Sequence, residues 1–262
     1  GNWMPSDDLL QKRADEAGFN PAINPAADDA RGMFRYSGFH NIDSHWQARA
    51  NLAWISDSRY LEDFSNSLYG LSSSSISSTL GVYGLGRNWS AGLMADNWQL
   101  TDYLLSDNSL PYNRLPRAYF NWDQPLGNLF AVGVQAEAVR FQHNERAGGS
   151  RLDLKPHISM PLQGASWYIT PTLAWRYTDY RLDGELADAI ALNRANAYVA
   201  ANGGTVTPAL IAGYRNVAPS RSLPIASLDA GLYFDRDTEI KGERFLQTLE
   251  PRLFYLNAPY RG

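Results

Sequence analysis

Three carboxylates alternate near the end of the chain, at Asp235, Asp237 and Glu239. Residues at positions i, i+2 and i+4 of a strand point to the same face, and carboxylate oxygens are the ligands that hard cations such as Ca²⁺ prefer. The run could therefore hold a cation. Arg236 lies within the run and a turn-like segment follows it, and both features favour a solvated strand end without a metal.

The other residue types that often carry chemistry form no known motif. The chain has no cysteine, which excludes a thiolate ligand or nucleophile within it. The segment GVYGLG at 81–86 departs from the GxGxxG pattern, and neither a Walker lysine nor a GxSxG elbow is present. The histidines show no metal-ligand spacing; they are His40, His45, His143 and His157. We therefore predict no catalytic residue, no cofactor and no metal site.

Composition narrows the class of protein. The 262 residues carry 23 basic and 27 acidic side chains, a net charge of −4, which argues against nucleic acid as a partner. With 44% apolar and 19% charged residues, the chain is too apolar for a disordered tail and should fold. Aromatic residues make up 13% of the chain, an enrichment that is typical of interfaces, including those with membranes.

Alternation of apolar and polar residues is the dominant pattern, and the segment 151–162 shows it most fully. Its apolar set would share one face of a strand and its polar set the other. The apolar set is Leu152, Leu154, Pro156, Ile158, Met160 and Leu162, and the polar set is Arg151, Asp153, Lys155, His157 and Ser159.

Similar segments recur along the chain, and in two of them aromatic residues bracket the apolar face: Trp46 with Trp54, and Trp167 with Tyr177. We predict about ten antiparallel strands joined by turn-rich segments. Their approximate ranges are 32–39, 46–54, 76–86, 88–98, 114–123, 130–138, 151–162, 167–177, 225–235 and 244–256.

The connections contain two predicted short helices. Ser6 would cap a helix over Asp7–Ala17, and Asp183 would cap one over Glu185–Ala200. Leu71–Ser78 (LSSSSISS) is predicted to be a flexible loop. A membrane-spanning helix needs about 20 consecutive, mostly apolar residues, and the chain offers no such run.

Alternation alone fits both a soluble β-sandwich and an outer-membrane β-barrel, in which the apolar face is turned outward. Strands of ten residues or more match the ~9–11 that cross a bilayer, whereas soluble strands most often have ~5–6. Aromatic residues at both ends of an apolar face are typical of membrane interfaces. These features favour the barrel, in whose wall Pro156 and Pro171 would weaken or bend the hydrogen-bonded ladder.

Several blocks of residues then resemble one family. The run QTLEPRLFYLNAPYR at 247–261 is similar to a signature of LptD, the family of lipopolysaccharide-assembly proteins of the outer membrane. LYFDRDTE at 232–239 resembles an aromatic–acidic strand end of that family. Three looser blocks follow the family order: MPSDD at 4–8, SDSRYLEDF at 56–64 and LDLKPHISMPL at 152–162.

The resemblance implies an all-β fold and a location in the Gram-negative outer membrane. Residues 1–262 would be a single segment of one antiparallel, up-and-down transmembrane β-barrel, a partial wall of about ten strands with long loops and without the family's periplasmic jellyroll domain. The implied function is non-enzymatic transport: the barrel receives lipopolysaccharide from periplasmic bridge proteins, and inserts it into the outer leaflet together with a plug lipoprotein, LptE.

In such a barrel the polar face of each strand lines the lumen. The candidate lumen-lining residues, with polar lining or contact with lipopolysaccharide or the plug as their role, are Gln47, Arg49, Asn51, Gln135, Glu137, Arg151, Lys155 and Arg176. Two alternatives remain open on the residues alone. A generic outer-membrane channel or receptor would need no plug lipoprotein. A soluble secreted β-sandwich that binds or hydrolyses glycans would stay in solution without detergent.

Overall fold

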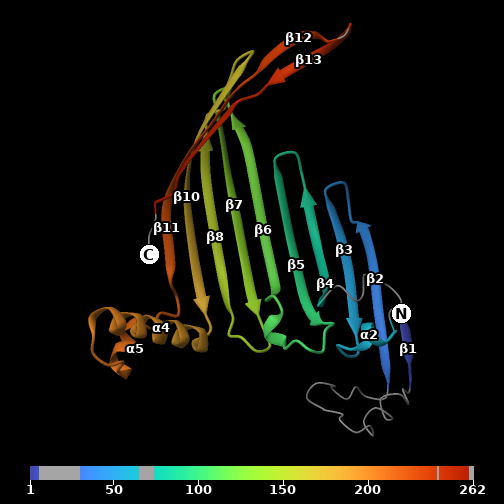
Figure 1. Ribbon diagram of the computed structural model, residues 1–262, viewed down its shortest axis with the longest axis vertical. Helices are drawn as coiled ribbons and strands as arrows, with labels where there is room; N and C mark the ends of the chain where they lie inside the picture. Colours follow the sequence, from blue (N-terminus) through green and yellow to red (C-terminus); the bar gives the residue numbers. More distant parts are fainter. Residues whose placement is uncertain (6–29, 65–73, 241, 260–262) are drawn as a thin grey trace.

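The computed structural model describes residues 1–5, 30–64, 74–240 and 242–259. Within these residues, twelve antiparallel strands form one sheet (Figure 1). Its strands are β1 (Asn2–Met4), β2 (Arg31–Asn41), β3 (Trp46–Ile55), β4 (Ser75–Leu85), β5 (Trp89–Leu100), β6 (Asn113–Leu126), β7 (Phe130–Gln142), β8 (Gly149–Ser159), β9 (Leu162–Gln163), β10 (Trp167–Leu182), β11 (Ser220–Leu232) and β14 (Arg252–Asn257).

The strands follow one another across the sheet in chain order. β9 is a short addition that pairs with β10, and β14 pairs with β11. The predicted up-and-down antiparallel architecture is therefore confirmed, as is the length of the strands, because β10 alone has 16 residues. Between β11 and β14 the chain forms a separate two-stranded ribbon, β12 (Phe234–Ile240) with β13 (Glu243–Leu249), which projects beyond the sheet (Figure 1).

The helices lie in the connections, as predicted. They are α2 (Tyr60–Phe64), α4 (Gly184–Asn202) and α5 (Pro208–Tyr214), with a 3₁₀ turn, η1, at Asp107–Ser109. The predicted helix over 185–200 is α4, which ends at Gly203 with φ +78°, a conformation that glycine adopts readily. The predicted helix over 7–17 lies outside the described residues. In the described part of the chain, no helix is both long enough and apolar enough to cross a membrane.

One predicted cap and one predicted loop need correction. Asp183 precedes α4 as expected, but its carboxylate accepts hydrogen bonds from the Arg140 guanidinium at 2.8 Å and from the Gly148 N–H at 3.0 Å instead of from the helix. The prediction of a loop over 71–78 is wrong for residues 75–78, because β4 begins at Ser75. Serine is compatible with a strand when neighbouring strands supply the ladder, so its loop preference is overridden here.

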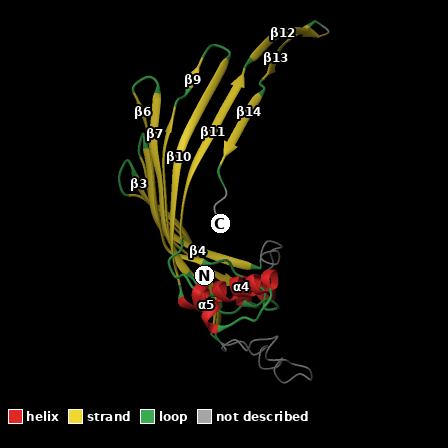
Figure 2. Cartoon of the chain, turned by 90° about the vertical axis from the view of Figure 1, so that its left-hand side faces the viewer, coloured by secondary structure: helices red, strands yellow, loops and turns green. Residues whose placement is uncertain are grey.

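Burial is reversed relative to a soluble sheet. Along β8, Leu152, Leu154 and Ile158 are exposed, whereas Arg151 and Asp153 are half-buried. Figure 2 shows the sheet as one curved layer, and nothing in the described part of the chain covers its apolar face. Side chains crowd on a concave face and spread apart on a convex one. The polar face is therefore the concave face of the curved sheet.

The two ends of the sheet differ in their connections. Turns of three or four residues, at 42–45, 86–88 and 127–129, join strands at one end, and the long connections that carry the helices lie at the other. In the first of these turns Asp43 accepts hydrogen bonds from the backbone N–H groups of His45 and Trp46, at 2.7 and 2.8 Å. These bonds hold the pKa of the Asp43 carboxyl below its ordinary value.

A small core closes the long-connection end beside β2. Ile55, Tyr60 and Leu61 are buried there. Arg31, only 1% exposed, donates from Nη2 to Asp57 at 2.8 Å and from Nη1 to Asp63 at 2.9 Å. This buried pairing ties α2 and its preceding loop to the start of β2.

Candidate functional site on the polar face

The eight predicted lumen residues share one face of the sheet. Residues paired directly across antiparallel strands point to the same side, so a lateral row can be followed from strand to strand. One row runs Gln47–Tyr83–Gly92–Tyr119–Glu137–Asp153–Thr178, and a second runs Arg49–Gly81–Met94–Arg117–Val139–Arg151–Tyr180. Asn51, Gln135, Lys155 and Arg176 are two residues from members of these rows along the same strands, and therefore face the same way.

Two groups of ion pairs lie side by side across four strands at the middle of this face, and together they form what we call the ion-pair network. The Glu137 carboxylate accepts from the Arg117 Nε and the Arg151 Nη2, each at 2.5 Å. Asp153 accepts from the Arg176 Nε at 2.9 Å, and from the Thr178 hydroxyl at 2.6 Å. Three of the eight predicted residues take part: Glu137 and Arg151 in the first group, and Arg176 in the second. The pairing holds the guanidinium groups in fixed positions.

The other predicted residues stay outside this network. Arg49 donates to the side-chain oxygen of Gln47 at 3.1 Å, and Asn51 accepts from the Ser37 hydroxyl at 2.7 Å. Gln135 and Lys155 are cross-strand partners, and neither forms a hydrogen bond or ion pair with another described residue. Their polar groups are therefore available to water or a ligand.

Two tyrosines and two charged residues on this face were not among the predicted set. Tyr83 and Tyr119 line a cavity of about 400 Å³ together with Arg117, Glu137 and other residues of the polar face. The alternation did not predict Arg117, because the registers of the β5–β6 and β6–β7 pairs both shift near this residue. The alternation placed Asp153 on the polar face of β8. Its partner Arg176 belongs to β10, so the ion pair could not be read from the sequence of β8 alone.

The carboxylate run near the chain end lies on β12. Asp235, Asp237 and Glu239 share one face of the ribbon, as the alternation predicted. Among the described residues, no group of three or more His, Asp or Glu side chains could hold a metal ion.

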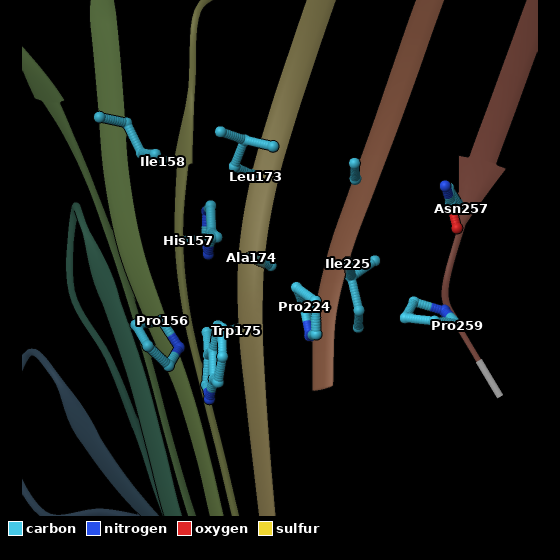
Figure 3. A pocket seen from close by; sticks show the side chains of 11 residues that line it. Pro156, His157, Ile158, Leu173, Ala174, Trp175, Pro224, Ile225, Asn257 and Pro259 are labelled. Carbon is cyan, nitrogen blue, oxygen red and sulfur yellow. The ribbon is translucent and has the colours of Figure 1, made fainter. Parts of the chain in front are cut away.

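The convex face carries an apolar cavity of about 590 Å³, on whose wall Figure 3 shows Pro156, Trp175 and Pro224 from three neighbouring strands. The β8–β10 ladder pairs Ala174 with His157 and Tyr177 with Leu154, but has no pair opposite Pro156. This interruption is the one predicted for a proline, which lacks a backbone N–H. The Trp175 indole N–H donates to the Ser222 hydroxyl at 2.9 Å, so the indole presents no unpaired donor there.

Comparisons with known proteins point to one family. A family model described as LPS transport system D, LptD, matches residues 29–262. The LPS-assembly protein LptD of Xanthomonas euvesicatoria pv. vesicatoria is 46% identical over 291 residues, covering 100% of this chain and 31% of the relative. The LPS-assembly protein LptD of Xanthomonas campestris pv. campestris is 47% identical to this chain, covering 100% of the chain and 31% of the relative. The protein of the same name in Xylella fastidiosa is 48% identical, covering 89% of the chain and 29% of the relative. The chain spans about a third of the length of these relatives.

Proposed function

The chain belongs to the LPS transport system D family, LptD, and from this membership we propose that it forms part of the wall of an outer-membrane β-barrel that inserts lipopolysaccharide into the outer leaflet. Residues 1–262 would be one segment of a single barrel domain. Because the relatives are about three times as long, the transport activity belongs to the complete protein. Family membership argues against the soluble glycan-binding protein and the generic channel that the residues alone left open.

The observation that carries the proposal is the reversed burial of the sheet. Leu173 and Trp175 are 62% and 50% exposed, whereas Glu137 is 20% exposed. Large apolar side chains that face water are unfavourable, by about 25 cal/mol for each Å² of apolar surface. In a bilayer the same surface lies against acyl chains, and the crowded polar face then encloses water. The proposed barrel therefore explains both faces.

The dimensions of the apolar face agree with a bilayer. Trp46 and Trp54 mark the two ends of the apolar face of β3, and eight residues of strand span about 27 Å, close to the ~25 Å apolar band of outer-membrane barrels. Tryptophans also lie near the short-turn ends of β5, β6 and β10. Since such barrels have short periplasmic turns and longer external loops, the long connections would face the outside of the cell.

On this proposal the polar face is the lumen lining and no covalent chemistry is required. The sugar part of lipopolysaccharide would pass along the lumen, and a plug lipoprotein of the LptE type would contact the same face. Periplasmic bridge proteins would deliver the substrate through parts of the protein outside this chain. The network around Glu137 would keep the wall rigid and hydrated, while Gln135 and Lys155 offer unpaired groups.

Site-specific photo-crosslinking in cells tests the proposal. A photo-reactive residue would replace Gln135 in the complete protein, and separately its neighbour Ala136, which lies on the opposite face of β7. Neither side chain forms a hydrogen bond or ion pair with another described residue, so each change leaves the polar network intact. We expect capture of lipopolysaccharide or the plug lipoprotein at position 135 but not at 136. Capture of neither at 135, in a protein that stays soluble without detergent, would contradict the proposal.

A further inference from the structure

Two tyrosine rings form a platform on the polar face, next to the ion-pair network. Tyr83 and Tyr119 both pair with Gly92, which lies between them in the lateral row. A Cβ atom at Gly92 would collide with the Tyr119 ring, and one at Gly81 would meet the Tyr83 hydroxyl and ring. Each ring therefore covers a glycine and lies along the sheet.

Hydrogen-bonding groups border the platform. The next lateral row contains Asn121, Gln135 and Lys155 as successive cross-strand partners. The Asn121 amide nitrogen donates to the Ser90 hydroxyl at 3.2 Å, which leaves its carbonyl oxygen as an acceptor. The Gln135 amide and the Lys155 ammonium have no partner among the described residues. An amide supplies both donors and an acceptor, and such groups match the neighbouring hydroxyls of a sugar ring.

The charge of this region is opposite in sign to that of the whole chain. In the three lateral rows, two carboxylates, Glu137 and Asp153, face five cationic side chains, and Asp123 lies in the adjoining row, which gives a local charge of +2 against −4 for the chain. The cations are Arg49, Arg117, Arg151, Lys155 and Arg176. The guanidinium group of Arg49 lies over the Tyr83 ring, 5.5 Å from its centroid, and that of Arg117 lies over the Tyr119 ring, 5.4 Å from its centroid. This excess favours an anionic ligand.

We propose that the cavity beside Tyr83 and Tyr119 is a subsite for an anionic saccharide, which passing lipopolysaccharide would supply. The apolar C–H face of a pyranose ring would pack against the parts of the tyrosine rings that line the cavity. The amides of the next row would bind its hydroxyls, and Lys155 in that row would attract its acidic substituent. A volume of about 400 Å³ lies within the range of small-molecule sites. The subsite rests on the proposed function and specifies which part of the substrate this wall binds.

Binding of a soluble fragment tests the subsite. The probe is the water-soluble oligosaccharide made by removing all acyl chains from lipopolysaccharide, and the neutral control sugar is maltoheptaose. The complete protein with its plug lipoprotein, in detergent, would be titrated with each sugar while saturation-transfer NMR reports the ligand protons near protein. We expect the signal to come mainly from ring C–H protons, and affinity for the anionic probe to fall as salt rises.

Variants then isolate the platform. Tyr119→Leu and Tyr83→Leu keep an apolar side chain and remove the ring, so each should weaken probe binding about tenfold. Tyr119→Phe should bind more tightly than Tyr119→Leu. Tyr36→Leu, on the convex face of β2, is the matched control and should bind as the unmodified protein does. Heat-modifiable gel migration confirms that each variant is folded.

The outcomes separate this inference from the proposed function. Unchanged probe binding in the Tyr83→Leu/Tyr119→Leu double variant overturns the subsite. Equal affinity for maltoheptaose overturns its anionic character. If lipopolysaccharide is still captured at position 135 in the complete protein, the transport proposal stands in either case. If neither lipopolysaccharide nor the plug lipoprotein were captured at position 135 in the protein with both tyrosines, the result would instead contradict the transport proposal itself.

Discussion

Replacing Glu137 by glutamine should destabilise the barrel wall, because one carboxylate holds two guanidinium groups. Arg117 and Arg151 each donate to Glu137 at 2.5 Å, and a hydrogen bond to a charged group contributes about 1.5–3 kcal/mol to stability. The three side chains are 20% to 29% exposed, and solvent reduces exposed pairs to about 0.2–1 kcal/mol. Glutamine retains one acceptor but leaves two like charges close together. We therefore expect a loss of about 2–3 kcal/mol of unfolding free energy.

Urea unfolding of the complete protein in detergent measures this loss, with folded protein quantified by its gel mobility. A decrease of 2–3 kcal/mol lowers the ratio of folded to unfolded protein about 30- to 150-fold. Gln135→Ala is the matched control on the same strand and face, and it should stay within about 0.5 kcal/mol because it breaks no bond between described residues. If Glu137→Gln also stayed within that range, the network would not be a stabilising element and our reasoning would fail.

Three further changes test other parts of the fold. Arginine at Ala136, on the convex face of β7, should destabilise the protein by about 2–4 kcal/mol in lipid, whereas arginine at Gln135 should be tolerated, as urea titration in vesicles would show. Arg31→Ala should cost about 3–5 kcal/mol locally, since it leaves two nearly buried carboxylates without this partner, and limited proteolysis of the connection after β3 should accelerate. Gly92→Val should displace the Tyr119 ring and reduce the yield of folded protein, whereas Gly127→Ala, at an open turn, should have a smaller effect despite its φ of +66°.

Alternation predicted the faces of the strands because side-chain direction in a strand depends only on local geometry. Gln135 and Lys155, for example, share one face of the sheet, as the alternation in their own strands indicated. Arg117 was missed because the ladder register shifts between Arg114 and Arg117, which breaks the period of two at that point. The helix before Gly203 was predicted from local signals, but the role of Asp183 was not, since its partners come from other segments.

The register between neighbouring strands was the part that the residues alone could not supply. The lateral row that joins Tyr83 to Glu137 depends on the register of three strand pairs, and each register follows from turn lengths and bulges. A slip of one residue between β4 and β5 would have placed Tyr83 on the face opposite Tyr119. The platform could therefore be recognised only once the register was known.

Some charged side chains of the polar face are paired with opposite charges and others are not, and this division suits the wall of a path along which an amphiphile must move. A transport path needs binding that is favourable enough for entry and weak enough for exit. Arg117, Arg151 and Arg176 are already paired with carboxylates, so a passing anion would have to compete for them and would bind each weakly. Lys155 has no such competitor among the described residues. Arg49 hydrogen-bonds only the neutral Gln47 side chain. Two cations without a carboxylate partner among the described residues, Arg49 and Lys155, would orient the sugar without trapping it, whereas five such cations would hold it in place.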